Sequence, residues 1–204
     1  MEIQTNLKNY HKMAQHQTPA SMLKESLFET LEAAEFCANY RKVDEKWGEF
    51  KTGGCLGFPA AILLFSIIDS IGSYYRKNSS FKIIIDNKET SISSDGWQHF
   101  KIINSKYFNQ NLSEKFIREL YNRFRSCLTH NSVLGKKTMM VMDNKSSGFN
   151  IENMPFFIAK TIDGEDIHVI SIKELSELCE SAINDLYKNI DKVVPISKQG
   201  KNFH

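Results

Sequence analysis

The sequence predicts a mainly α-helical fold, a bundle of helices with a small antiparallel β-sheet inserted before the C-terminal helix. Residues 112–131 place apolar side chains on one face at helical spacing, and residues 59–77 are apolar almost all round, which favours helices. After Gly135 the apolar spacing changes from helical to alternating. Asp163-Gly164 stands between two alternating runs, a strong signal for a β-hairpin.

A chain of 204 residues is long enough for one domain with an appendage. We expect residues 18–192 to form that domain, preceded by a polar leader at 1–17 and followed by a disordered tail at 193–204. Within the domain we expect three parts, which are a helical core over about 18–135, a β-hairpin over about 138–171, and a C-terminal helix over 172–192.

Each core helix has its own signals. Thr18-Pro19 provides an N-cap followed by proline, which starts a first helix that we expect to run to about Lys46. The apolar second helix is expected from about Pro59 to Lys77. Ser113 is a plausible N-cap for the amphipathic helix at 112–131.

The shorter elements follow from turn and cap residues. Asp86-Asn87 suggests a short hairpin within 78–94, and Asp95 is expected to cap a third, short helix that carries His99. We interpret His99 as structural, because no nucleophile lies beside it in the sequence. Ser171-x-x-Glu174 has the form of a capping box and opens the last helix, which we expect to reach about Lys192.

Composition excludes several classes of protein. The hydrophobic fraction is 41%, the charged fraction is 25% and the net charge is +2, so the chain does not coat nucleic acid by charge alone. The four cysteines lack metal-type spacing, and we expect no metal and no cofactor. The N-terminus lacks the apolar stretch of a signal peptide, and the apolar run Leu56–Ile68 is too short to span a bilayer. We therefore expect a cytoplasmic protein that does not enter a membrane.

Asp69 is the one carboxylate inside the apolar second helix. A buried carboxylate is costly unless it is paired. Two interpretations stay open: Asp69 lies at the rim or bonds a neighbouring helix, or it pairs with Arg125 and fixes that guanidinium, whose fork matches a carboxylate.

The candidate catalytic residues are Arg125 and His130, at the end of the amphipathic helix in RSCLTHN. In a continuous α-helix they would stand about 140° apart around the axis and about 7.5 Å apart along it. To converge, the helix must bend or end between them, or a second copy of the chain must supply the facing pair. This run resembles the R-x4-6-H motif of the HEPN superfamily, and GFPAAILLFSIIDSIGSYYR resembles the second helix of bacterial proteins of this type.

The resemblance covers roughly residues 20–135 and implies a small all-α domain, a homodimer with two motifs meeting at the two-fold axis, and metal-independent ribonuclease activity. Such proteins act in toxin–antitoxin and defence systems, which implies RNA and an antitoxin or defence protein as partners. His130 would serve as general acid or base and Arg125 would stabilise the phosphate. Ser126 and Asn131 could support them. Ser126 departs from the Asn often found after the motif Arg in active members, so the alternative is a catalytically silent dimeric binding or regulatory module.

Basic residues surround the motif and could guide an RNA backbone, or could form an ordinary solvated surface. The candidates for RNA binding are Arg118, Arg123, Lys136 and Lys137.

Overall fold

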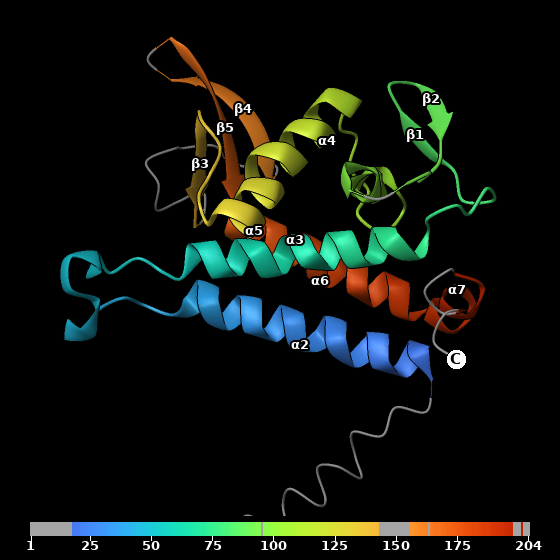
Figure 1. Cartoon of the computed structure of the whole chain (residues 1–204), viewed down its shortest axis with the longest axis horizontal. Helices are drawn as coiled ribbons and strands as arrows, with labels where there is room; N and C mark the ends of the chain where they lie inside the picture. Colours follow the sequence, from blue (N-terminus) through green and yellow to red (C-terminus); the bar gives the residue numbers. More distant parts are fainter. Residues whose placement is uncertain (1–17, 95, 143–155, 163, 198–200, 202–204) are drawn as a thin grey trace, which may run out of the picture.

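Three long helices form the base of the molecule in a computed structural model, which describes residues 18–94, 96–142, 156–162, 164–197 and 201. These helices are α2 (Pro19–Asn39), α3 (Gly57–Tyr74) and α6 (Ile172–Tyr187), and Figure 1 shows them side by side, with α4, α5 and both sheets above α3. The mainly helical fold class is therefore confirmed. The leader at 1–17, Asp95 and half of the expected tail, residues 198–200 and 202–204, lie outside the described residues.

The central element is α3, which contacts α2, α6 and the 3-10 helix η2 (Gly96–Asn104). Eight of its residues are buried, namely Ala60, Ala61, Leu64, Phe65, Ile67, Ile68, Ile71 and Gly72. Among the described helices, α3 alone is long and apolar enough to cross a membrane by length and composition. The same apolar side chains are buried in the core of the fold, so α3 packs inside the helical bundle.

The first helix is shorter than predicted. Thr18 caps α2 as expected, since its Oγ1 accepts from the Ser21 backbone N–H at 3.1 Å, but α2 ends at Asn39 and not near Lys46. Arg41 Nη1 donates to the Ala38 carbonyl at 2.9 Å, which satisfies a carbonyl of the last turn. The chain then forms a separate 3-10 helix, η1 (Glu45–Phe50), that projects from the bundle (Figure 1).

The motif helix is continuous but not uniform. It consists of α4 (Glu114–Leu120), a π-helical turn η3 (Tyr121–Ser126) and α5 (Cys127–Asn131). Ser113 caps it as predicted, because its Oγ accepts from the Phe116 backbone N–H at 3.3 Å. π-Helical turns are rare in proteins, and those that occur are often found at functional sites.

The inserted sheet has three strands in the order β3 (Thr138–Val141), β5 (Glu165–Ser171), β4 (Phe157–Ile162). The predicted hairpin is confirmed for β4 and β5, which pair antiparallel. The expectation that all strands are antiparallel is wrong, because β3 pairs parallel with β5. Since β5 lies between the other two strands, β3 neighbours β5 and not β4, the next strand in the sequence, so the strand order differs from that of a simple meander. A second, two-stranded sheet joins β1 (Ile83–Ile85) to β2 (Lys88–Thr90) through the predicted Asp86-Asn87 turn.

The C-terminal region also differs from the prediction. α6 ends at Tyr187, and a further helix, α7 (Ile190–Ile196), occupies residues assigned to the end of one helix and to a disordered tail. Ile190 and Val194 are fully buried, which fixes α7 against the bundle. The capping box at the start of α6 is not formed: Ser171 is the N-cap residue, but its side chain makes no capping hydrogen bond.

Gly72 sets how closely α3 and η2 approach. A methyl group at Gly72 would overlap the His99 carbonyl and lie 2.9 Å from the His99 Cα, both of which are backbone atoms. We expect Gly72→Ala to lower the free energy of unfolding by at least about 2 kcal/mol, measured by urea denaturation. The matched control is Gly57→Ala, whose methyl group would meet only the Cys55 Sγ at 3.5 Å and the Met140 Cε at 3.7 Å. Equal stability of both variants would contradict the close approach of these two helices.

Candidate functional site

Asp69 bridges two side chains that come from two different elements. Its Oδ2 accepts from Arg125 Nη2 at 2.6 Å, and its Oδ1 lies 2.7 Å from His99 Nδ1. The Asp69 side chain is 19% exposed, so the pair is largely shielded from water. Each of the two interpretations left open by the sequence describes part of what is observed, because Asp69 pairs with Arg125 and also bonds His99 of the neighbouring helix η2.

The chemistry of the carboxylate decides the roles of its neighbours. An ionised carboxylate only accepts hydrogen bonds, so the proton of His99 lies on Nδ1 and is donated to Asp69. Burial alone would raise the pKa of Asp69, but the hydrogen bond from His99 and the charge of Arg125 outweigh it and hold the pKa below its usual range. Asp69 is therefore ionised at neutral pH, and Arg125 is held in a fixed orientation.

The local structure explains how Arg125 reaches Asp69. Arg125 lies in the π-helical turn η3, and its guanidinium lies 5.4 Å from the centre of the Tyr121 ring. Tyr121 in turn contacts Phe100 edge-on, with 5.2 Å between the ring centres. Because Phe100 is fully buried beside Phe65 of α3, this row of rings ties the motif helix to the core.

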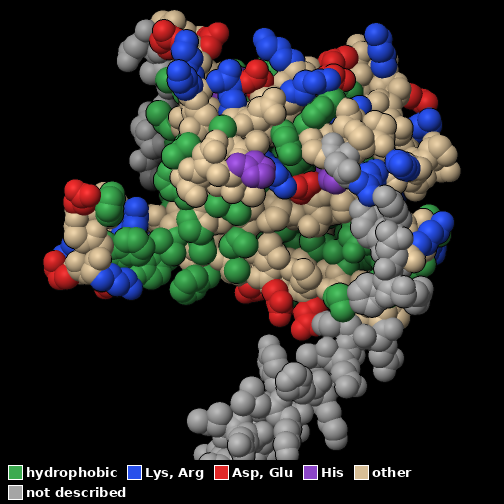
Figure 2. Space-filling model, viewed as in Figure 1, with side chains coloured by type: hydrophobic (Ala, Val, Ile, Leu, Met, Phe, Trp, Pro, Cys, Tyr) green, Lys and Arg blue, Asp and Glu red, His purple; other side chains and the backbone are tan. Residues whose placement is uncertain are grey.

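His130 lies on α5 beyond this cluster, and its side chain is exposed. Among the described residues it forms no ion pair or hydrogen bond with Arg125 within one chain. The two expected supporting residues differ in their exposure to solvent. Ser126 is half-buried, whereas Asn131 is exposed at the end of α5. Figure 2 shows histidine, basic and acidic side chains next to one another across the middle of this face, with apolar side chains below and beside them. The structure thus brings Asp69 and Arg125 together and leaves His130 accessible nearby on the same helix.

The expected RNA-binding residues are mostly paired with carboxylates. Arg118 donates to Glu114 at 2.8 Å and its guanidinium lies 3.8 Å from the centre of the Trp97 ring. Arg123 pairs with Glu119 and also donates to the Lys136 carbonyl at 2.7 Å.

The two lysines of this set differ from each other. Lys137 pairs with Glu165. Lys136 is exposed, and no described carboxylate pairs with it. Of the four candidates, Lys136 is the one whose charge is most available to a polyanion.

Sequence reasoning assigned His99 a structural role but gave it no partner. The signal that could have found it was the need of Asp69 for more than one donor, because a buried carboxylate has two oxygens to satisfy. His99 is 8% exposed, so it supports Asp69 and does not itself face solvent.

In the described part of the chain, no three His, Cys, Asp or Glu side chains lie close enough together to hold a metal ion. The cysteines Cys37, Cys55, Cys127 and Cys179 are free thiols. Comparison with protein-family models, with curated proteins and with solved structures gives no match to this chain.

The pKa of Asp69 predicts how stability depends on pH. Asp69→Asn removes the charge that pairs with Arg125, and we expect it to lower the free energy of unfolding by about 2–3 kcal/mol at pH 7. Because the pKa of Asp69 is lower in the folded chain than in the unfolded chain, this contribution is complete above the unfolded pKa of about 4 and is lost as the pH falls through the folded pKa. Denaturant titrations of wild type and Asp69→Asn should therefore converge in acid.

The control for this prediction is Asp191→Asn, which removes an exposed carboxylate that lies 3.2 Å from Lys24. That change should alter the stability by less than about 0.5 kcal/mol. A gap between wild type and Asp69→Asn that stays constant down to about pH 2 would show that Asp69 does not contribute through its charge.

Proposed function

We propose that this chain is a metal-independent endoribonuclease of HEPN-like type, acting as a homodimer in the bacterial cytoplasm within a toxin–antitoxin or defence system. The observation that carries the proposal is the guanidinium of Arg125, which Asp69 holds in place, on a helix whose end carries the exposed His130. The resemblance of RSCLTHN to the R-x4-6-H motif supports the same assignment.

The chemistry needs few groups. One His130 takes the proton from a ribose 2′-OH, whose oxygen attacks the adjacent phosphorus, and the bond from phosphorus to the 5′-oxygen breaks. A second His130 protonates that leaving oxygen, which gives a 2′,3′-cyclic phosphate end and a 5′-hydroxyl end. Arg125 stabilises the charge on the phosphate oxygens, because it keeps its proton throughout. The two histidines come from the two copies of the chain.

The homodimer has support from the exposed side of α3. Ser66 is exposed one turn before Asp69, and Phe58, 47% exposed, lies on the same helix. Val133, which follows α5, is 53% exposed, and α5 packs on α3. Figure 2 shows apolar side chains beside the polar row on this face. Pairing of two copies through this face would place each Arg125 and His130 close to the two-fold axis.

A second function is favoured by the ion pair itself. Because Asp69 already neutralises Arg125, the site carries less positive charge than phosphoryl chemistry normally uses. A dimeric binding or regulatory module without catalysis would keep the same pair for stability. Its partners would be RNA or an antitoxin or defence protein.

The test of catalysis is single-turnover cleavage of a mixed-sequence RNA in EDTA. We expect wild type to cleave and to leave 2′,3′-cyclic phosphate ends, and we expect His130→Ala to lower the rate about a hundredfold or more, since it removes the acid and base. Asn122→Ala, an exposed change on the same helix, should cleave like wild type. If the folded, dimeric wild type leaves the RNA intact, the binding module replaces the ribonuclease.

The dimer is tested separately. Ser66→Arg places a long charged side chain on the exposed side of α3 and should shift the protein from dimer to monomer in sedimentation equilibrium, while its circular dichroism spectrum stays unchanged. Ser181→Arg makes the same change at an exposed position of α6 and should remain dimeric. If both variants stay dimeric, the copies meet through another surface.

A further inference from the structure

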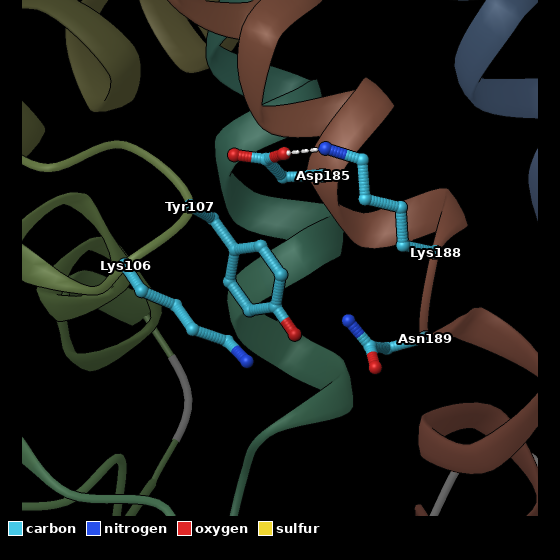
Figure 3. A pocket seen from close by; sticks show the side chains of 5 residues that line it. All are labelled: Lys106, Tyr107, Asp185, Lys188 and Asn189. Atoms are coloured by element: carbon cyan, nitrogen blue, oxygen red, sulfur yellow. Dashed lines mark hydrogen bonds and ion pairs between the residues drawn. The ribbon is translucent and has the colours of Figure 1, made fainter.

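A polar pocket of about 200 Å³ lies between the segment after η2 and the corner that joins α6 to α7. Its lining residues are Lys106, Tyr107, Asp185, Lys188 and Asn189. In Figure 3 the ammonium group of Lys106, the hydroxyl of Tyr107 and the amide of Asn189 point into the same space, and Lys188 reaches toward Asp185 beside it. None of Asp69, His99 and Arg125 lines this pocket.

The Tyr107 hydroxyl has a hydrogen to give to a ligand. It shares a hydrogen bond with the Tyr75 hydroxyl, and neither oxygen has another hydrogen-bond partner among the described residues. Burial raises the pKa of Tyr75, and the hydrogen bond to Tyr107 raises it further, so Tyr75 keeps its hydrogen. Two hydroxyl groups carry two hydrogens, but only one can lie between the two oxygens. When Tyr75 donates to Tyr107, the hydrogen of Tyr107 is available to the pocket.

The tyrosine at the base of the pocket is held rigidly. Tyr107 is 4% exposed, and its ring lies against those of Tyr75 and Phe81, with 5.6 and 6.3 Å between the ring centres. Phe81 stacks on Tyr75 with 3.9 Å between the centres. A donor fixed in this way needs no reorganisation to bind an acceptor.

The charges in the pocket leave a positive excess. Lys188 Nζ pairs with Asp185 Oδ1 at 2.5 Å, which neutralises the one carboxylate of the lining. Lys106 Nζ lies 5.3 Å from the centre of the Tyr107 ring and has no carboxylate partner in the described part of the chain. The pocket therefore offers one uncompensated ammonium group, one buried hydroxyl and one amide.

We propose that this pocket binds a phosphate group, either as inorganic phosphate or at the end of a nucleotide. A phosphate has several strong acceptor oxygens and at least one negative charge, which match the converging donors and the charge excess. The pocket is smaller than the about 300–1,000 Å³ typical of drug-sized ligands, so it suits a phosphate group with the rest of the molecule outside.

The proposal is tested by isothermal titration calorimetry of the full chain with inorganic phosphate, 5′-AMP and adenosine. We expect saturable binding of phosphate, of 5′-AMP or of both, with no binding of adenosine. Binding to both with similar affinity identifies free phosphate as the ligand, whereas at least about tenfold tighter binding of 5′-AMP identifies a nucleotide phosphate.

Three variants identify the residues. Lys106→Ala should weaken binding about tenfold, because it removes a charge-assisted hydrogen bond, and Tyr107→Phe should weaken it about fivefold. Asp185→Asn should strengthen binding about fivefold, since it removes the one negative charge of the lining and frees Lys188. The control is Lys88→Ala, an exposed lysine on β2 that should bind like wild type.

Four outcomes would overturn the proposal. One is no saturable heat with either phosphate probe up to about 10 mM. Another is binding of adenosine as tight as that of 5′-AMP. Equal affinities of Lys106→Ala and Lys88→Ala would show that Lys106 takes no part. Weaker binding by Asp185→Asn, with its thermal unfolding unchanged, would show that the pocket prefers a cation or an amine.

Discussion

A carboxylate inside an apolar helix must be compensated, and the arrangement around α3 follows from how Asp69 meets this requirement. Leaving an ionised carboxylate unpaired in a largely water-free setting costs several kcal/mol, on the order of the whole stability of a domain. Asp69 binds two partners, one on each oxygen, His99 from η2 and Arg125 from η3. Neither partner is near Asp69 in sequence, so the burial of an ionised Asp69 depends on the tertiary placement of both η2 and η3.

The packing around this cluster leaves little freedom. Gly72, one turn beyond Asp69, has no side chain because the backbone of His99 occupies that space. On the other side, the π-helical turn η3 places Arg125 over Tyr121, and Tyr121 contacts the buried Phe100. A regular α-helix through residues 121–126 would rotate every later side chain relative to the core. The same contacts therefore fix the polar cluster and the hydrophobic core. Arg125 bonds Asp69 and also lies over Tyr121, which packs on the buried Phe100.

Much of the fold could be predicted from local patterns, because periodicity and caps are local. Thr18 and Ser113 cap their helices as expected, and Asp86-Asn87 forms its turn. The place of β3 beside β5 could not be predicted, since the order of strands in a sheet depends on long-range pairing that no short motif encodes. The end of α2 was misplaced because Arg41 satisfies a carbonyl of its last turn, and helix boundaries are the least determined feature of a sequence.

In the candidate site too, features set by local sequence could be predicted and features set by tertiary contacts could not. The pair of Asp69 and Arg125 could be named from the sequence as one of two interpretations, because an acid in an apolar helix and an arginine at a helix end are a chemical match. His99 could not be placed, since its contact with Asp69 depends on the tertiary approach of η2 to α3. The π-helical turn could not be predicted either. Such turns are rare, and the apolar periodicity of residues 121–126 is that of an ordinary α-helix.

The ion pair also constrains what the site can do. A phosphate that approaches Arg125 meets a guanidinium already shared with Asp69, so part of its positive charge is already compensated. Arg123, Arg118 and Lys137 are likewise paired with carboxylates, which leaves Lys136 as the unpaired member of the basic set in the described residues. Among the four predicted RNA-binding residues, one copy of the chain therefore offers a single unpaired positive charge. A two-fold arrangement would bring a second Arg125 and a second His130 to the same phosphate, so that the chemistry proposed for the site depends on the homodimer rather than on the single chain.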